Sequence, residues 1–289
     1  MIPLLMIGER MVGAGLPPYV IAEAAFNHGG NLGVAKEMVR VAAEAGCDAV
    51  KFQTYKTAQF CRPDDPMYQE FLRGELPDAA WYELKSYCVA NDITFLSTPQ
   101  NPDDLELLLD VGIPAVKVGS DDVANGPVLK QMAAMANVPF LLSCGMAEPP
   151  EVMDALSIMR AYGRRVALMV CSSQYPCPPE EANLSRISTL RAKHPELVIG
   201  YSDHTQWIEA SIMAVTFGAA LLEKHFALQP DGSVDHAHAL GPKGLQVWVK
   251  SARKAHAMIG DGDLRLSAAE RASRAKWQRR AGEQIRGAA

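Results

Sequence analysis

Two short stretches of the chain each carry a histidine near their end, where it is placed to bind a metal ion. "GYSDHT" contains Ser202 and His204, and "LEKHF" contains Glu223 and His225. Both follow apolar runs typical of buried strands, in which side chains two positions apart share a face. Two imidazoles from adjacent strands bind a borderline divalent cation and leave positions open for water and substrate. We therefore predict that His204 and His225 are metal ligands, and that the metal polarises a carbonyl or activates water.

Lysines and hydroxyl side chains occupy the ends of other apolar runs. Lys51 and Lys117 lie in strand-like stretches, where burial of a lysine is costly unless it is paired or bound to a ligand. Ammonium groups supply charge and hydroxyls supply directional donors, a combination that suits a dense anion carrying phosphate and carboxylate groups. The hydroxyls at these strand ends belong to Thr98, Ser120, Ser143, Ser173 and Ser202.

Three carboxylates accompany these groups. Glu23, Asp122 and Glu223 also stand at or just beyond strand ends, where they are available as acid–base or orienting groups. An anionic substrate, a polarised carbonyl and proton transfer together suggest carbon–carbon bond formation from an enol phosphate.

An alternation of strands and helices must position these side chains. Helix-like segments, several of them closing with Gly or Asn, separate the apolar runs. Eight such units predict a single-domain α/β protein with a (β/α)8 TIM barrel, whose active site lies at the carboxyl ends of the strands. A doubly wound open sheet is the alternative. The runs are 19–27, 48–55, 93–98, 115–120, 139–145, 166–173, 197–203 and 221–226.

The pattern divides the chain into three segments. We expect a short N-terminal hairpin over 1–18, the catalytic barrel over 19–262 and a helical tail over 263–289. The longest insertion, 56–79, follows the second strand, so we expect it to form a lid over the mouth of the barrel.

Composition excludes several other classes of protein. The 289 residues are 48% hydrophobic and 21% charged with a net charge of −5, so neither nucleic acid nor an anionic membrane is an expected partner. No segment approaches the ~20 apolar residues of a membrane helix. The six cysteines show no zinc-type or disulfide-framework spacing, which favours a cytoplasmic location. Cys144 and Cys171 are interpreted as inert thiols.

The stretches that carry these residues resemble the N-acetylneuraminate (sialic acid) synthase family. The matching stretches occur in family order over about 20–260 and are "IAEAAFNHGG", "GCDAVKFQTYK", "FLSTP", "PAVKVGS", "LSCGMA", "YPCP", "GYSDHT" and "EKHF". The resemblance implies a carbon–carbon bond-forming transferase. Such an enzyme condenses phosphoenolpyruvate with an N-acyl hexosamine, such as N-acetylmannosamine, to a nonulosonic 2-keto acid and phosphate.

The resemblance also implies roles for individual residues. The metal, Mn²⁺ or Mg²⁺, falls on His204 and His225. Lys51, Lys117, Glu23 and Asp122 become the catalytic residues, the last two through proton handling. The phosphoenolpyruvate contacts fall on Lys51, Thr98, Lys117, Ser120, Ser143, Ser173 and Ser202, and the sugar contacts on Glu23, Gln53, Tyr175 and Asp235.

The sequence departs from the family pattern at several points. "SDD" replaces the usual Ser-Gly-Glu, so that Asp122 stands where the family has a glutamate, and "STPQN" replaces a pattern with Phe-Asp. Family members usually form dimers and continue into an antifreeze-like C-terminal domain, whereas this sequence stops about where the linker would begin. A homodimer is expected.

Other interpretations remain open at this point. A synthase for a phosphorylated or non-hexosamine aldehyde would need additional arginines, for which Arg62 and Arg73 are the candidates. A metal-dependent hydrolase barrel would show an HxH motif on its first strand, which is absent. A non-catalytic relative is the third alternative. We interpret His28 as a lid or supporting residue, and the pair His236 and His238 as part of a substrate loop.

Overall fold

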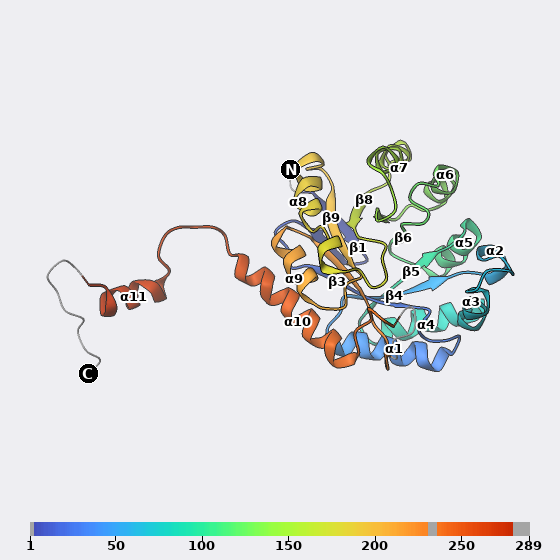
Figure 1. Cartoon of the computed structure of the whole chain (residues 1–289), viewed down its shortest axis with the longest axis horizontal. Helices are drawn as coiled ribbons and strands as arrows, with labels where there is room; N and C mark the ends of the chain where they lie inside the picture. Colours follow the sequence, from blue (N-terminus) through green and yellow to red (C-terminus); the bar gives the residue numbers. More distant parts are fainter. Residues whose placement is uncertain (1–2, 231–235, 280–289) are drawn as a thin grey trace. The chain divides into compact units, whose positions relative to one another are not determined.

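Eight parallel strands alternate with helices along the chain (Figure 1). The computed structural model describes residues 3–230 and 236–279. The strands pair in the order β5-β4-β3-β10-β9-β8-β7-β6, and β5 also lies beside β6, so the sheet curves into a nearly closed barrel. The predicted (β/α)8 fold is therefore confirmed. The strands are β3 (Tyr19–Ala25), β4 (Ala49–Thr54), β5 (Thr94–Pro99), β6 (Val116–Val118), β7 (Phe140–Ser143), β8 (Val166–Val170), β9 (Val198–Asp203) and β10 (Leu221–His225).

Helices fill the connections between the strands. The first helix, Leu32–Ala45, is capped by Asn31, whose side chain accepts hydrogen bonds from the Gly33 and Val34 amides. Gly46 follows the helix with a φ of +84°, a left-handed conformation that favours glycine. The helices are α1 (Leu32–Ala45), α2 (Thr57–Phe60), α3 (Tyr68–Gly74), α4 (Asp78–Ala90), α5 (Pro102–Val111), α6 (Gly126–Met135), α7 (Pro149–Ala161), the 3₁₀ turn η1 (Pro179–Glu181), α8 (Ser185–Lys193), α9 (Glu209–Thr216), α10 (Pro242–Ile259) and α11 (Ala268–Trp277).

Each strand carries an inner face that changes character along its length. On β3, Tyr19 and Ile21 belong to a buried apolar cluster inside the barrel, and Glu23 follows on the same face. On β10, Leu221 belongs to that cluster and Glu223 follows. The period of two in strand side chains thus places apolar residues at the amino ends of the strands and polar ones at the carboxyl ends.

The predicted N-terminal hairpin is present and closes the apolar end of the barrel. Its strands β1 (Leu4–Ile7) and β2 (Arg10–Gly13) pair antiparallel. Leu5, Ile7 and Val12 are buried in the same cluster as the inner strand residues. Because the hairpin excludes water from this end, the polar carboxyl ends of the strands are left to form the site.

The segment 56–79 contains α2 and α3 and is fastened by aromatic contacts. The Phe71 ring lies 4.9 Å from Phe60 and 5.5 Å from Phe26, measured between ring centroids, and Tyr55 donates a hydrogen bond to the Phe71 carbonyl. These contacts attach the expected lid to the side of β3 and β4.

Contacts within the chain define one compact unit over 1–257 and another over 258–289. In the second unit, Ser267 caps α11 by accepting a hydrogen bond from the Glu270 amide, and the Glu270 side chain accepts one from the Ser267 amide. None of the helices in the described ranges is long and apolar enough to span a bilayer.

Candidate active site

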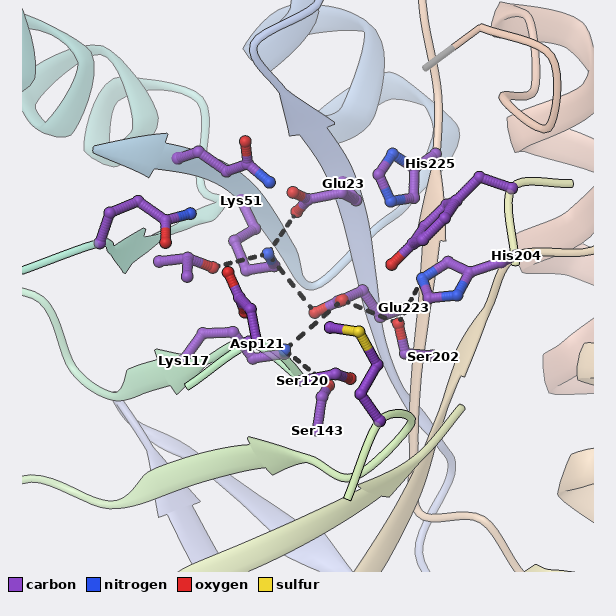
Figure 2. Close-up of a pocket in the computed structure, with 16 residues that line it drawn as sticks. Glu23, Lys51, Lys117, Ser120, Asp121, Ser143, Ser202, His204, Glu223 and His225 are labelled. Atoms are coloured by element: carbon purple, nitrogen blue, oxygen red, sulfur yellow. Dashed lines mark hydrogen bonds and ion pairs between the residues drawn. The ribbon is translucent and has the colours of Figure 1, made fainter. Parts of the chain in front are cut away.

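A cavity of about 190 Å³ opens at the carboxyl ends of the strands, where the sequence places the polar residues (Figure 2). Side chains from β3, β4, β5, β6, β7, β9 and β10 and from the loops that follow strands contribute to its wall. The lining residues are Glu23, Lys51, Gln53, Thr98, Gln100, Lys117, Gly119, Ser120, Asp121, Ser143, Met146, Tyr175, Ser202, His204, Glu223 and His225.

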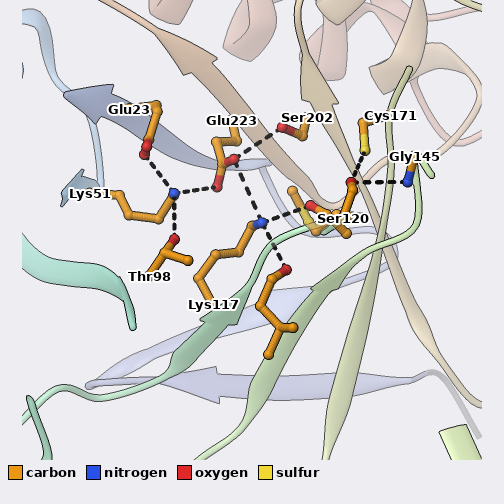
Figure 3. Close-up of polar contacts among 12 residues, drawn as sticks. Glu23, Lys51, Thr98, Lys117, Ser120, Gly145, Cys171, Ser202 and Glu223 are labelled. Carbon is orange, nitrogen blue, oxygen red and sulfur yellow. Dashed lines mark hydrogen bonds and ion pairs between the residues drawn. The ribbon is translucent and has the colours of Figure 1, made fainter. Parts of the chain in front are cut away.

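Strand register aligns one row of these side chains. His225 pairs with Glu23 across β10 and β3, and Glu23 pairs with Lys51 across β3 and β4. The Lys51 Nζ lies 2.7 Å from Glu23 Oε2, donates to Thr98 Oγ1 at 2.9 Å and lies 3.8 Å from Glu223 Oε2 (Figure 3). These contacts keep the buried ammonium group pointing into the cavity.

Glu223 joins the two lysines from the middle of the cavity floor. The Lys117 Nζ donates to Ser143 Oγ at 2.7 Å and lies 4.0 Å from Glu223 Oε1, and Ser202 Oγ donates to the same Oε1 at 3.0 Å. Because one carboxylate faces both ammonium groups, they stay together at the base of the cavity (Figure 3).

The two buried glutamates titrate in opposite directions. Burial raises the pKa of Glu23 to about 7, against the attraction of Lys51. Burial acts in the same direction on Glu223, but Lys117 and Lys51 together lower the pKa of Glu223 to about 2. Near neutral pH, Glu23 can therefore exchange a proton while Glu223 remains an anion.

The loop after β7 forms a tight wall beside the lysines. Ser120 Oγ accepts a hydrogen bond from the Gly145 amide at 3.1 Å and lies 3.2 Å from Cys171 Sγ. A Cβ atom at Gly145 would lie 2.4 Å from Ser173 Oγ and 2.7 Å from Cys171 Sγ, so a larger residue there would force these side chains to move. Ser173 supports this wall and does not line the cavity itself.

Two histidine rings lie edge to face on the other side of the cavity from the lysines (Figure 2). The centroids of His204 and His225 lie 5.6 Å apart, and the Tyr175 ring lies 4.3 Å from His204. His204 Nδ1 donates to the Ser172 carbonyl at 2.7 Å, which leaves the lone pair of the neutral ring on Nε2. Burial lowers the pKa of His204 to about 4, so the ring is neutral, as a metal ligand must be.

This pair fits a metal that also binds water and substrate. Within residues 3–230 and 236–279, no three histidine, cysteine, aspartate or glutamate side chains are grouped to hold an ion by themselves. His204 and His225 would therefore supply two ligands of an open site.

A third histidine adjoins the pair although the sequence pattern did not assign it there. His238 is 1% exposed, and its ring lies 4.4 Å from His225 and 5.2 Å from Tyr175. The HxH pattern of His236 and His238 was the one sequence signal for this position. The sequence could not show how close these residues lie to His225 at the end of β10.

His28 lies away from the cavity, with its ring 5.8 Å from that of Phe52, and burial lowers the pKa of His28 to about 4. Asp235, expected to contact the sugar, lies outside the described residues.

Asp122, expected to handle protons, does not line the cavity in this conformation. Its carboxylate accepts a hydrogen bond from Asn125 Nδ2 at 3.2 Å, and its amide donates to the Gly119 carbonyl. This turn before α6 directs Asp122 to the helix start, so that its neighbour Asp121 lines the cavity instead.

The sequence interpretation also missed Gln100 and Met146 as lining residues. Both directly follow stretches singled out as strand ends, "FLSTP" and "LSCG". No residue of the segment 56–79 lines the cavity, so the expected lid does not cover it in this conformation.

The chain also matches known proteins. The model of the NeuB family matches residues 38–264. N,N'-diacetyllegionaminic acid synthase of Campylobacter jejuni is 34% identical over 87% of this chain and 80% of its own length. N-acetylneuraminate-9-phosphate synthase of Mus musculus is 33% identical over 92% of this chain and 78% of its own length. A crystal structure of N-acetylneuraminic acid synthetase from Leptospira borgpetersenii superimposes with a TM-score of 0.89 at 31% identity, over 94% of this chain and 95% of that one. With the barrel and its cavity, these matches show that the chain belongs to the NeuB family and is an enzyme of the sialic acid synthase-like type.

Proposed function

We propose that this enzyme condenses phosphoenolpyruvate with an N-acyl hexosamine, such as N-acetylmannosamine or a related sugar, to give a nonulosonic 2-keto acid and phosphate. One observation carries the proposal: two buried ammonium groups and a pair of buried imidazoles line the same cavity of about 190 Å³. The names of the legionaminic acid and neuraminate-9-phosphate synthases support this class of product.

The lysine side of the cavity binds the anionic donor. Lys51 and Lys117 provide two positive charges, and the hydroxyls of Thr98, Ser143 and Ser120 provide donors around them. Glu223 holds both ammonium groups at the cavity floor. Since this arrangement exists before the donor binds, little reorganisation is needed to hold a phosphate and a carboxylate.

The histidine side faces the acceptor aldehyde. His204 and His225 would hold a divalent metal, for which we propose Mn²⁺ or Mg²⁺, and when bound this ion supplies Lewis acidity toward a carbonyl oxygen. Gln53 and Tyr175 line the same cavity and can hydrogen-bond sugar hydroxyls. The aldehyde carbon is thereby directed toward the enol carbon of the donor.

The reaction requires one proton to be taken and one to be returned. The enol carbon attacks the aldehyde, and the new alkoxide takes up a proton. Water adds to the resulting oxocarbenium carbon and loses a proton. The carbon–oxygen bond to phosphate then breaks, and phosphate leaves with the bridging oxygen and the proton of the new hydroxyl as the ketone forms. Glu23, with a pKa raised to about 7 by burial, is suited to both transfers. Asp122 accepts a hydrogen bond from Asn125 and does not line the cavity.

Oligomeric state and location belong to the same proposal. We propose a homodimer, on the strength of the family resemblance. All six cysteines are free thiols, which supports a reducing compartment such as the cytoplasm.

Phosphate release from phosphoenolpyruvate with a panel of aldoses tests the proposal. We expect release that needs both a divalent metal and an N-acyl hexosamine, a product mass equal to that of the condensed 2-keto acid, and ¹⁸O from the bridging position of the donor in the phosphate. Release with other aldehydes alone would favour a 3-deoxy-keto-acid synthase type. No release with any aldose would favour a non-catalytic relative.

A histidine variant tests the metal site. His225→Ala should abolish turnover and metal binding measured by calorimetry, while circular dichroism shows an unchanged fold. His256→Ala, the same change on α10 and outside the cavity, is the matched control. Full activity in His225→Ala would refute the metal role.

A further inference from the structure

We propose that Asp121 makes the cavity select an uncharged aldose and reject the phosphate ester of the same sugar. This inference rests on the proposed function and specifies its acceptor, because that function leaves open whether the acceptor carries a phosphate. It follows from the position of Asp121 and from the balance of charge around the cavity.

The Asp121 side chain is directed at the cavity by its own loop. It is exposed, so it stands at the mouth and not on the buried floor, and it lines the cavity together with Gly119 and Ser120 (Figure 2). A Cβ atom at position 119 would lie 2.0 Å from Asp121 Oδ1. The carboxylate thus folds back over Gly119, and a side chain at position 119 would displace it.

The cationic groups of the cavity are already opposed by carboxylates. Lys51 lies 2.7 Å from Glu23 and 3.8 Å from Glu223, and the same Glu223 lies 4.0 Å from Lys117. The positive charge of two lysines and one divalent metal is therefore already matched or exceeded by these glutamates together with a single phosphoenolpyruvate. They leave no positive charge for a second phosphate.

No arginine side chain lines the cavity in the described part of the chain. Arg62 is 83% exposed beside Asp64, and Arg73 pairs with Glu70 on the surface of α3. The candidates for a second phosphate site therefore lie elsewhere. An acceptor phosphate entering this cavity would instead meet the Asp121 carboxylate.

Coulomb repulsion gives the size of the expected effect. A phosphate dianion within about 10 Å of one carboxylate, at the high effective dielectric of a cavity mouth, is disfavoured by about tenfold. The effect should shrink as ionic strength rises.

Adjacent aspartates provide a matched test. We would measure kcat/KM with phosphoenolpyruvate for N-acetylmannosamine and for its 6-phosphate, in the full chain and in Asp121→Asn and Asp122→Asn. Both variants remove one negative charge, but only Asp121 lines the cavity. We expect the natural chain to prefer the uncharged sugar. Asp121→Asn should raise the relative kcat/KM of the phosphate ester about tenfold, and Asp122→Asn should leave this ratio unchanged.

The possible failures are distinguishable. A preference of the natural chain for the phosphate ester overturns the inference, and so does an equal effect of the two variants, while the condensation itself would stand. Absence of phosphate release with every aldose overturns the proposed function and the inference together. Asp121→Glu keeps the charge and should keep the discrimination, so its loss there would also contradict a charge-based explanation.

Discussion

Replacement of Glu223 by glutamine should destabilise the barrel more than the same replacement of a surface glutamate. The Glu223 side chain is 5% exposed and faces Lys51 at 3.8 Å and Lys117 at 4.0 Å. In Glu223→Gln, Lys51 keeps Glu23, but Lys117 loses the one carboxylate that lies within 4.0 Å of it among the described residues. A buried ammonium group without its counter-charge costs about 3 kcal/mol, which corresponds to a fall in Tm of about 10 °C.

Thermal unfolding followed by circular dichroism measures this effect. Glu83→Gln removes the same charge from a surface pair with Lys36, at 2.8 Å but with the Glu83 side chain 56% exposed, and should lower Tm by less than about 2 °C. Added inorganic phosphate should restore more stability to Glu223→Gln than to the natural chain, because the anion replaces the missing charge between the lysines. Equal Tm values for the two variants would refute the charge network as a structural element.

Three further changes test other parts of the structure. Gly145→Ala should reduce phosphate release on the order of 100-fold while circular dichroism is unchanged, because the new Cβ would lie 2.4 Å from Ser173 Oγ; normal kinetics would contradict the tight wall. Asp203 lies 3.2 Å from the fully buried Lys224 ammonium group. Asp203→Asn leaves that ammonium group without its carboxylate and should lower the free energy of unfolding, measured in urea, by about 3–5 kcal/mol. A loss below about 1 kcal/mol would show that the pair is dispensable. Burial lowers the pKa of His28 from 6.5 to about 4, so the folded chain binds fewer protons than the unfolded one between these pH values. Its free energy of unfolding should therefore fall by about 3 kcal/mol as pH drops from 6.5 to 4. His28→Phe should flatten this part of the curve of stability against pH, and an unchanged slope would exclude His28 as its source.

Local patterns were sufficient to locate most of the cavity. Apolar runs with charged or hydroxyl residues near their carboxyl ends predicted all eight barrel strands, and Lys51, Lys117, Glu223 and His204 all line the cavity. The reason is that strand periodicity and the end of each run are both encoded locally. Once the strands form a barrel, their carboxyl ends must converge.

The positions of loop residues could not be predicted in the same way. Asp121 and Asp122 are chemically identical neighbours, and which of them reaches the cavity depends on a turn whose partners are the Gly119 carbonyl and Asn125. His238 reaches the histidine pair from a segment beyond the last strand. Neither position follows a periodic pattern, so neither could be predicted from spacing.

The amino-acid sequence alone thus determined the barrel, the end at which chemistry takes place and the kinds of group that gather there, because each depends on the periodicity of single strands and helices. Only the tertiary structure decided the opposite titration of Glu23 and Glu223, the choice between two adjacent aspartates and the packing of His238. These depend on distances between groups on different strands and loops, and such distances exist only after the chain has closed around its cavity.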